Sequence, residues 1–554
     1  MHILLERVAP GRVAVIRGDD DRSEVADAEL ADLVRAAEAE RRPRWVWSDT
    51  RTWYPPLLRS GVRVERCVDL RLSHAILRSS TLTAGSALAS AVPGPWDGAA
   101  QPDALPEEGS AALFDLDGPE PEAPPSAAAE FAAQQEAVAA SAEPGRLRLL
   151  LAAESAGALI AAEMQHAGLP YSVERHDQLL TALLGPRPRF GRPAVMEELA
   201  AELREALETP GLNPDSPPEV LKALQRAGLM ATSTRSWELR ELDHPAIAPL
   251  LRYKKLSRLH SANGWTWLDT WVADGRFRPD YIPGGVVTGR WATRGGGALQ
   301  LPKEVRAAVV ADPGWKLVVA DAAQLEPRIL TGLSADTAMA AAGRGTDLYA
   351  GIVATGAVAE RAQAKVAMLG AMYGATTGDS GRLMPRLARA FPRAVRLVED
   401  AARTGESGGV VTSRLGRSSP PPGPGWRSIQ EAASGSDSTQ AEERRARSRA
   451  RDWGRFTRNF VVQASAAEWA LCWMAELRNR LTRLGPGGAP FTAAPHLVYF
   501  LHDEVIVHTP AELADDVAEA VTVSAAAAGR LLFGAFPVDF PVTAAVVDSY
   551  GDAK

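Results

Sequence analysis

Two apolar runs that end in acidic residues limit the folds open to this 554-residue chain. The first run leads into Asp321, and the second leads into His502, Asp503 and Glu504. The first pattern predicts a strand that ends at a carboxylate and is followed by a helix. The second continues into another apolar run, which predicts a β-hairpin with acids at or near its tip. Taken alone, each acid could equally be a cap or turn residue.

The two acids gain a chemical meaning when they are considered together. Carboxylate oxygens are the ligands that hard cations such as Mg²⁺ prefer. Asp321 and Asp503 could share two divalent ions about 3.5–4 Å apart, an arrangement that activates an attacking hydroxyl and stabilises a leaving pyrophosphate. The sequence therefore predicts that these two distant residues meet in space.

A basic helical segment lies between the two acids. Arg361, Lys365, Leu369 and Tyr373 follow one another at intervals of four residues. Each such step advances about 400° and 6 Å on a helix, so the four side chains form one slowly turning stripe roughly 18 Å long. Its two cations can pair with a triphosphate while the aromatic ring lies against a base pair. A core helix with two snorkelling cations is the alternative for this segment alone.

Composition excludes several classes of protein. The chain is 46% hydrophobic and 23% charged and has no apolar run of about 18 residues that could span a bilayer. The N-terminus lacks the pattern of a secretory leader, and Cys67 and Cys472 form neither a disulfide framework nor a zinc motif. We therefore expect a cytoplasmic, nucleoid-associated protein without membrane contact.

Local arginine clusters outweigh the overall acidity of the chain. A net charge of −7 argues mildly against binding to nucleic acid, but phosphate binding depends on local cationic surface. Two runs in the C-terminal half could supply it: Arg382, Arg386, Arg389, Arg393 and Arg396, and then Arg444, Arg445, Arg447, Arg449 and Arg451. Either run alone could equally be a solvated helix face or a basic loop.

The three segments, in this order, resemble motifs A, B and C of the family A DNA polymerases, the DNA polymerase I type. Similar segments are Thr288-Gly289-Arg290, residues 299–302, residues 409–417 and residues 455–463. The resemblance covers residues 146–554. It implies an α/β and α+β multidomain fold: a right hand of palm, fingers and thumb, with an N-terminal ribonuclease H-like domain of the exonuclease type.

The resemblance also implies roles for single residues. Asp321 and Asp503 would bind two Mg²⁺ ions, assisted by Glu504, and Lys365 would protonate the leaving pyrophosphate. The incoming deoxynucleoside triphosphate would meet Arg361, Lys365, Tyr373, Glu326, Gln324 and Leu369, with Glu326 excluding ribonucleotides. Primer-template DNA would be contacted by Arg290, Arg455, Asn459, Gln463 and His502. We expect the protein to act as a monomer.

The expected domains follow the same comparison. They are a degenerate exonuclease-like domain with linker (residues 1–140), thumb (141–275), first part of the palm (276–345), fingers (346–450, with an inserted loop at 418–449) and second part of the palm (451–554). No 5′ nuclease domain is expected before residue 1.

Several positions depart from the family pattern. Leu369 stands where the family has an aromatic residue, Ala322 and Ala323 replace a Tyr-Ser pair, and Tyr349 replaces a histidine. Leu369 puts the discrimination of the sugar 3′ position in question. Together the departures also allow for low processivity or an unusual substrate preference.

The N-terminal region lacks most acids of a proofreading site. Asp49 could match one carboxylate of the exonuclease motifs, but the strand expected near residues 13–16 carries no Asp-x-Glu, and a later Tyr-x-x-x-Asp appears as Phe131 to Gln135. A site short of three carboxylates cannot hold two divalent cations. We therefore expect no proofreading, with Asp49 acting as a turn or cap residue.

Three other functions compete with a template-directed DNA polymerase. A 3′-5′ exonuclease is disfavoured because the intact acids lie in the polymerase half. A non-catalytic DNA-binding protein derived from a polymerase is disfavoured because, without selection for activity, the metal-binding acids should have been replaced as readily as other polar residues. A single-subunit RNA polymerase is disfavoured by Glu326.

Overall fold

The computed structural model describes residues 1–18, 21–98, 126–294, 301–345, 347–374, 378–435, 437–486 and 490–553. Leu299 and Gln300, part of one motif segment, lie outside these residues, as does most of the expected linker. The chain divides into two compact units. The first comprises Met1–His166, Tyr281–Ala292 and Ala320–Ala545, and the second comprises Ala167–Asp280, Thr293–Val319 and Val546–Lys554.

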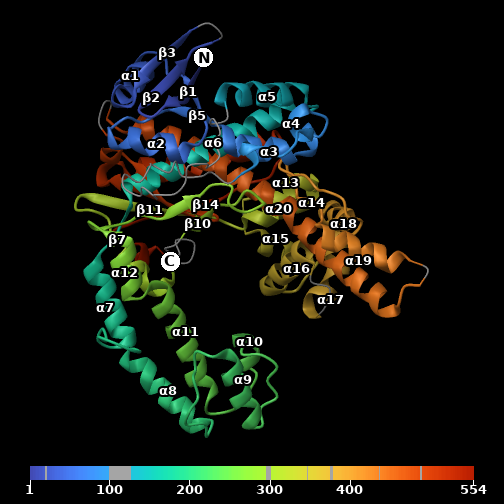
Figure 1. The fold of residues 1–554 in the computed structure, drawn as a ribbon. Coiled ribbons are helices and arrows are strands. Elements are labelled where there is room, and N and C mark those ends of the chain that lie inside the picture. The colour runs from blue at the N-terminus through green and yellow to red at the C-terminus, as the bar shows by residue number, and fades with distance from the viewer. Residues whose placement is uncertain are drawn as a thin grey trace, which may run out of the picture. The chain divides into compact units, whose positions relative to one another are not determined.

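A mixed five-stranded sheet opens the first unit (Figure 1). Its order is β3-β2-β1-β4-β5, with antiparallel pairing among the first three strands and parallel pairing of β1, β4 and β5. The strands are β1 His2–Ala9, β2 Arg12–Ile16, β3 Arg22–Ala26, β4 Arg44–Trp47 and β5 Arg66–Asp69. Trp45 and Trp47 are fully buried and form the centre of its core.

Helices surround this sheet and connect it to the rest of the first unit. They are α1 Asp27–Glu40, α2 Thr50–Arg59, α3 Leu70–Ser79, α4 Ala87–Ser90, α5 Ala127–Ala140 and α6 Pro144–Ala167. Helix α6 is buried nearly all round, as expected for a helix inside a core. It therefore packs into the first unit, although residues from 141 on were expected to begin the thumb. The second unit begins at Ala167.

A four-stranded sheet of order β12-β13-β11-β14 forms the other core of the first unit. Its strands are β11 Trp315–Ala322, β12 His496–Leu501, β13 Glu504–Pro510 and β14 Val542–Val547, and β11 enters the first unit at Ala320. Helix α20 (Gln440–Leu484) and helix α21 (Ala514–Phe533) pack beside each other and against this sheet. Trp469 and Trp473 of α20 are fully buried there.

The remaining helices of the first unit carry the basic segments. They are α13 Leu325–Ser334, α14 Thr337–Gly343, α15 Leu348–Ala354, α16 Arg361–Tyr373, α17 Gly378–Ala390, α18 Pro392–Glu406 and α19 Pro424–Ser434. The expected loop at residues 418–449 is wrong for its larger part, because α19 and the first turns of α20 form a helical hairpin there. Its Pro and Gly residues lie at the start of α19, where they are tolerated, and Thr439 caps α20.

The second unit consists mainly of helices: α7 Val173–Leu184, α8 Ala194–Ala206, α9 Pro217–Arg226, α10 Ser236–Leu239, α11 Ile247–Asn263 and α12 Trp265–Trp271. Its strands β6 Leu169–Pro170, β7 Val272–Ala273 and β8 Arg276–Phe277 form a small sheet. Two short paired strands, β9 Asp280–Ile282 and β10 Ala292–Arg294, each include a position in the sequence at which the chain passes from one unit to the other.

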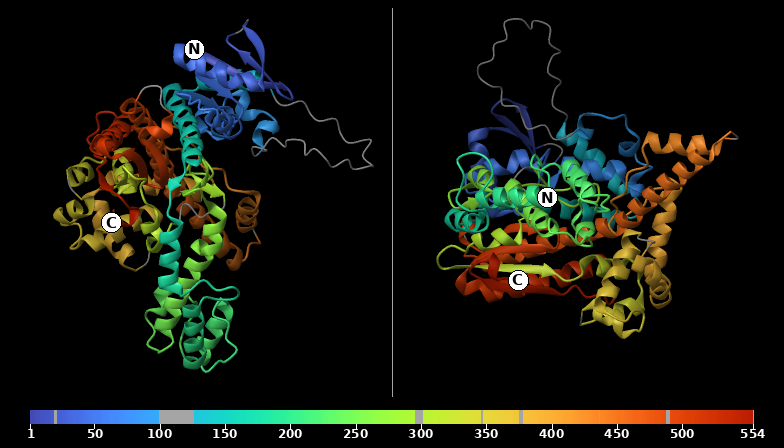
Figure 2. Two further views of the ribbon diagram at one scale, coloured as in Figure 1. Left: turned by 90° about the vertical axis from the view of Figure 1, so that its left-hand side faces the viewer. Right: turned by 90° about the horizontal axis from the view of Figure 1, so that it is seen from below.

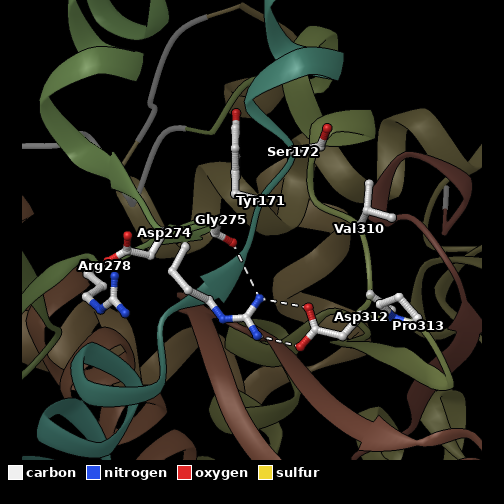
Figure 3. A pocket seen from close by; sticks show the side chains of 10 residues that line it. Tyr171, Ser172, Asp274, Gly275, Arg278, Val310, Asp312 and Pro313 are labelled. Carbon is white, nitrogen blue, oxygen red and sulfur yellow. Dashed lines mark hydrogen bonds and ion pairs between the residues drawn. The ribbon is translucent and has the colours of Figure 1, made fainter.

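A groove of about 480 Å³ lies in the second unit (Figure 3). Arg276 reaches across it to Asp312, with 2.9 Å between Nη1 and Oδ1. None of the site residues expected from the sequence is among those that line it. In the part of the chain that the structure describes, no helix is both long and apolar enough to cross a membrane.

Candidate active site

The structure brings the main chains of the two predicted metal acids together. Asp321 is the penultimate residue of β11, and Asp503 lies in the turn between β12 and β13. The amide of Ala322 donates a hydrogen bond of 2.9 Å to the carbonyl oxygen of Asp503. Both acids are half-buried. Two residues that are far apart in the sequence therefore occupy neighbouring strand ends.

The hairpin turn is tighter than its sequence suggests. Leu501 faces Glu504 across the ladder, so only His502 and Asp503 form the turn. His502 adopts the left-handed conformation, with φ of 58°. Glu504 begins β13 and is 2% exposed. The structure therefore places Asp503, rather than an Asp-Glu pair, at the tip.

The carboxylates near this turn suit a magnesium site that is completed by substrate and water, and do not suit a site made of protein ligands alone. Among the described residues, no group of three or more His, Cys, Asp or Glu side chains could hold a metal ion. Magnesium is commonly bound by one or two carboxylates together with substrate phosphates and water. Asp321 and Asp503 are the right kind and number of protein ligands for such a shared site, which a substrate would complete.

Glu326 joins three separate segments of the site. One oxygen of its carboxylate accepts a hydrogen bond from Arg290, and the other accepts one of 2.8 Å from the hydroxyl of Tyr373. Burial raises the pKa of Tyr373, and the hydrogen bond to Glu326 raises it further. The loop before motif A, helix α13 and the end of α16 are thereby held together.

The DNA-contact residues expected from the sequence gather partly around this carboxylate. Gln463 of α20 lies beside Tyr373 and opposes the rise in its pKa. Burial lowers the pKa of His502, and the charge of Arg290 lowers it further against an opposing effect of Glu326, so His502 also lies near the group. Four of the predicted site residues, Arg290, Tyr373, Gln463 and His502, thus lie near Glu326.

The other two expected DNA contacts lie farther along α20. Arg455 is exposed and forms an ion pair with Asp452. Its side chain covers Gly374, the left-handed residue that ends α16, where an added Cβ would come within 2.9 Å of the Arg455 Cγ. Asn459 is half-buried, and its Oδ1 has no hydrogen-bond partner among the described residues.

The cationic helix has the orientation that its spacing predicts. Arg361, Lys365 and Tyr373 are exposed and Leu369 is half-buried, whereas the opposite face, including Ala364, Ala367, Met368 and Ala371, is buried. The two predicted phosphate ligands therefore lie on the solvent side of α16.

Arg361 already has an acidic partner in the structure. Its Nη2 lies 2.7 Å from Oδ2 of Asp347, and its guanidinium lies 5.5 Å from the ring centre of Tyr349. Gln324 donates to the same Asp347 oxygen. Burial of Asp347 would raise its pKa, but the hydrogen bonds, first that from Arg361, outweigh it and lower the pKa.

Sequence reasoning missed this role of Asp347. The residue is recognisable as a helix cap, and its side chain does accept a bond of 2.8 Å from the amide of Ala350. No local spacing links it to Arg361, however, because the two residues are brought together by the packing of α15 against α16.

A second missed feature is a buried ion pair beneath the Thr288–Arg290 segment. Arg417 donates a bond of 2.7 Å to Glu154, whose side chain is 1% exposed. Gly289 packs against this arginine so closely that an added Cβ would lie 2.5 Å from its Nε. The sequence did offer one indication of this ion pair, because Glu154 stands inside the otherwise apolar middle of α6 and a buried carboxylate needs a partner.

The N-terminal acids act as helix caps. Asp49 caps α2 by accepting a bond of 2.8 Å from the amide of Arg51, and Asp69 caps α3 by accepting one of 3.0 Å from the amide of Leu72. Burial, followed by the nearby charge of Asp49, raises the pKa of Asp69 to about 7. The interpretation of Asp49 as a cap residue is confirmed.

Comparisons with known proteins agree with this geometry. The model of the family described as DNA polymerase family A matches residues 194–552. Thermostable DNA polymerase I of Thermus filiformis is 24% identical over 351 residues, which are 57% of this chain and 37% of the relative. DNA polymerase I of Chloroflexus aurantiacus is 27% identical over 52% of this chain and 31% of the relative. The chain thus matches about a third of the length of these relatives.

A solved structure resembles nearly the whole chain. It is the POL domain of Pol1 from M. smegmatis in complex with DNA primer-template and dNTP, with a TM-score of 0.65 and 18% identity. The match covers 98% of this chain and 93% of that chain. The expected multidomain fold, with both α/β and α+β parts, is therefore confirmed.

Proposed function

We propose that this chain, which belongs to DNA polymerase family A, is a template-directed DNA polymerase that adds deoxynucleotides to a primer 3′ end. The observation that carries the proposal is the hydrogen bond between Ala322 and Asp503, which holds the strand end of Asp321 beside the hairpin turn. It supports a joint role for the two acids at one reacting phosphate.

Asp321 and Asp503 would hold two magnesium ions, which when bound would lower the pKa of the primer hydroxyl and neutralise charge on the phosphates. The chain itself would supply positioning and proton transfer. Lys365 would hold the triphosphate and protonate the leaving pyrophosphate. Arg361 would exchange Asp347 for a phosphate oxygen, because a guanidinium pairs well with either anion.

Glu326 and Tyr373 would select the sugar. Their hydrogen bond of 2.8 Å fixes both side chains beside the end of α16. A ribose 2′-hydroxyl would therefore clash with side chains that cannot move aside. Gln324 and Leu369 would line the same nucleotide site. Arg290, Arg455, Asn459, Gln463 and His502 would contact the primer-template, with Glu504 supporting the hairpin from its buried position.

We further propose that the N-terminal region is an exonuclease-type domain without proofreading activity. Asp49 and Asp69 are 8% and 2% exposed and are engaged by backbone amides. Such carboxylates stabilise helix starts and are poorly placed to share two cations. A monomer that works on DNA in the cytoplasm, at the nucleoid, is the form that we expect.

Primer extension by the purified full chain tests the proposal. A labelled primer-template is supplied with the four deoxynucleotides, in separate reactions with ribonucleotides, and with Mg²⁺ or a chelator. We expect extension that follows the template, requires Mg²⁺ and falls by at least about 10³-fold in Asp321→Asn and Asp503→Asn. Asp516→Asn, an exposed acid of α21, is the matched control.

DNA binding by the same variants separates the proposal from its alternatives. If wild-type protein binds primer-template but never extends it, the chain is a non-catalytic DNA-binding protein. If it shortens a mismatched primer and Asp49→Ala abolishes that shortening, the exonuclease is active. If ribonucleotides are preferred, an RNA polymerase is favoured.

A further inference from the structure

The helical hairpin of α19 and the first turns of α20 has no role in the proposed reaction. It lies in the first unit on the side of α16, α17 and α18, beyond the four-stranded sheet (Figures 1 and 2). The side-chain amide of Gln430 donates a bond of 2.9 Å to the carbonyl of Ala446, which fastens α19 to α20. The hairpin is therefore a defined extension of the long helix α20.

Arginines on α20 are arranged on one face of this extension. At 100° per residue, Arg444 and Arg451 lie within about 20° and 40° of Arg455. Ala446 and Thr457, both buried, lie about 180° and 160° from Arg455. The arginine stripe, defined as Arg444, Arg451 and Arg455, therefore faces away from the packing side of α20.

Part of this stripe carries uncompensated positive charge. Within the stripe, Arg455 forms an ion pair with Asp452. Arg447, which is outside the stripe, forms one with Glu443. Arg444 and Arg451 are exposed, and among the described residues neither forms an ion pair. Arg444 donates only from Nε, to the carbonyl of Gln440 at 3.1 Å.

The stripe is continuous with the proposed active site. Beyond Arg455, Asn459 and then Gln463 follow at intervals of four residues, each about 40° farther around the helix. Gln463 lies beside Tyr373. From Arg444 to Gln463 the helix advances about 28 Å. Its inner end thus lies where the new base pair would form, and its outer end lies at the hairpin.

We propose that the arginine stripe binds the phosphates of the unpaired template strand ahead of the new base pair. This inference rests on the proposed function, in which the primer must end at Asp321 and Asp503. Only the template continues past that point. A cationic line that leads from Tyr373 away from the sheet suits a single strand whose backbone follows it.

Binding measurements on matched DNAs test the inference. Fluorescence anisotropy compares two primer-templates that share one duplex but have a template overhang of one or of ten nucleotides, without metal or nucleotide. Arg444→Ala/Arg451→Ala is compared with Arg445→Ala/Arg449→Ala. The control pair removes two exposed arginines of the same stretch of helix, Arg445 about 100° around the helix from Arg444 and Arg449 about 160° from Arg451.

We expect wild-type protein and the control pair to bind the long overhang more tightly than the short one. The stripe pair should lose most of this preference. For the stripe pair, the slope of log affinity against log salt concentration should be smaller in magnitude by about 1.4, the value for two lost single-strand phosphate contacts. Circular dichroism should show unchanged helix content, because both positions are on the solvent face.

Three results would overturn the inference: no overhang preference in wild type, an equal loss on both DNAs, or an equal loss in the control pair. Failure of the proposed function is a different result, because it would appear as absent primer extension by wild-type protein. If extension is intact and the stripe pair behaves like the control pair, only the inference about the hairpin fails.

Discussion

At the scale of single residues, ion pairs hold two arginines of the proposed site, and in the proposed reaction the substrate would replace or share these pairs. Arg361 is held by Asp347 and Arg290 by Glu326. Both arginines belong to the set expected to meet substrate. The two ion pairs could not be predicted from the periodicity of the sequence, because each joins residues of different elements.

Replacing Asp347 tests whether this pairing competes with nucleotide. In Asp347→Asn the side-chain oxygen can still cap α15 through the amide of Ala350, but it no longer neutralises Arg361. We expect the KM for deoxynucleotides to fall by up to about 5-fold at low salt with little change in kcat, the effect of losing one exposed ion pair of about 1 kcal/mol or less. Steady-state extension kinetics measure both constants.

The control for Asp347 is an acid near the same helix without this contact. Glu360→Gln alters the exposed residue before α16 and should leave KM unchanged. A rise in KM for Asp347→Asn would contradict competition and would instead make Asp347 a residue that positions Arg361 for the phosphates.

At the scale of elements, the Thr288–Arg290 segment depends on a glycine that packs on a buried ion pair. Gly289 has φ of 82°, and an added Cβ would approach Arg417 Nε to 2.5 Å. We expect Gly289→Ala to lower the free energy of unfolding by about 1–3 kcal/mol more than Gly314→Ala. Gly314 has φ of 79° and open space around it.

This pair of variants separates backbone strain from packing. Thermal unfolding measures stability, and primer-template affinity reports on Arg290, which follows Gly289 directly. Equal effects of the two substitutions would show that Arg417 can move aside and that the buried ion pair does not fix the segment.

Helix α20 also carries a buried acid whose ionisation opposes folding. Glu468 accepts a bond of 2.9 Å from the amide of Leu415 and another from Ser413. Burial raises its pKa from 4.5 to about 7 against these hydrogen bonds. The folded protein therefore holds an extra proton between about pH 4.5 and 7, so the free energy of unfolding falls as pH rises through that window.

Glu468→Gln should remove this pH dependence. Gln can still accept from the Leu415 amide and can donate to the Ser413 hydroxyl. Between pH 5 and pH 8 we expect the variant to gain up to about 2.5 kcal/mol relative to wild type, because the folded wild type loses the proton of Glu468 in that range. Thermal melts at both pH values test this, with Glu476→Gln of the same helix as control. A constant difference between variant and wild type would contradict it.

At the scale of the whole molecule, a buried charge network joins the N-terminal region to α20 within the first unit. Glu163 of α6 accepts bonds of 2.6 Å from Arg478 and 2.9 Å from Arg63, as well as one of 2.7 Å from the hydroxyl of Tyr54. Burial would raise the pKa of Glu163, but Arg478 and then Arg63 outweigh it and lower the pKa.

We expect Arg478→Met to destabilise the first unit by about 3–5 kcal/mol, because it leaves the carboxylate of Glu163 buried with one arginine fewer. The double variant Arg478→Met/Glu163→Gln should recover much of this loss. Arg480→Met, which removes a partly exposed pair with Glu476, should cost less than 1 kcal/mol. Chemical unfolding compares the four proteins. No recovery in the double variant would contradict the buried charge as the cause.

The sequence allowed much of this architecture to be predicted, for identifiable reasons. Strong apolar runs fixed the strands that end near Asp321 and Asp503, and the spacing of four fixed the exposed face of α16. The hairpin at residues 418–449 could not be predicted, since its Pro, Ser and Gly content is typical of loops while its helices are stabilised by packing on Ala446. The contacts of Asp347 and Glu154 depend on tertiary packing alone.

The proposed function requires Asp321 and Asp503 to hold the catalytic cations together, and counting the bound ions tests this requirement. Mn²⁺, as a spectroscopic substitute for Mg²⁺, is titrated by electron paramagnetic resonance into the full chain with primer-template and a non-hydrolysable deoxynucleotide. We predict two tightly bound ions in wild type and the loss of at least one in both Asp321→Asn and Asp503→Asn, with Asp516→Asn unchanged. An ion count that is the same in all four proteins would contradict the assignment of Asp321 and Asp503 as metal ligands.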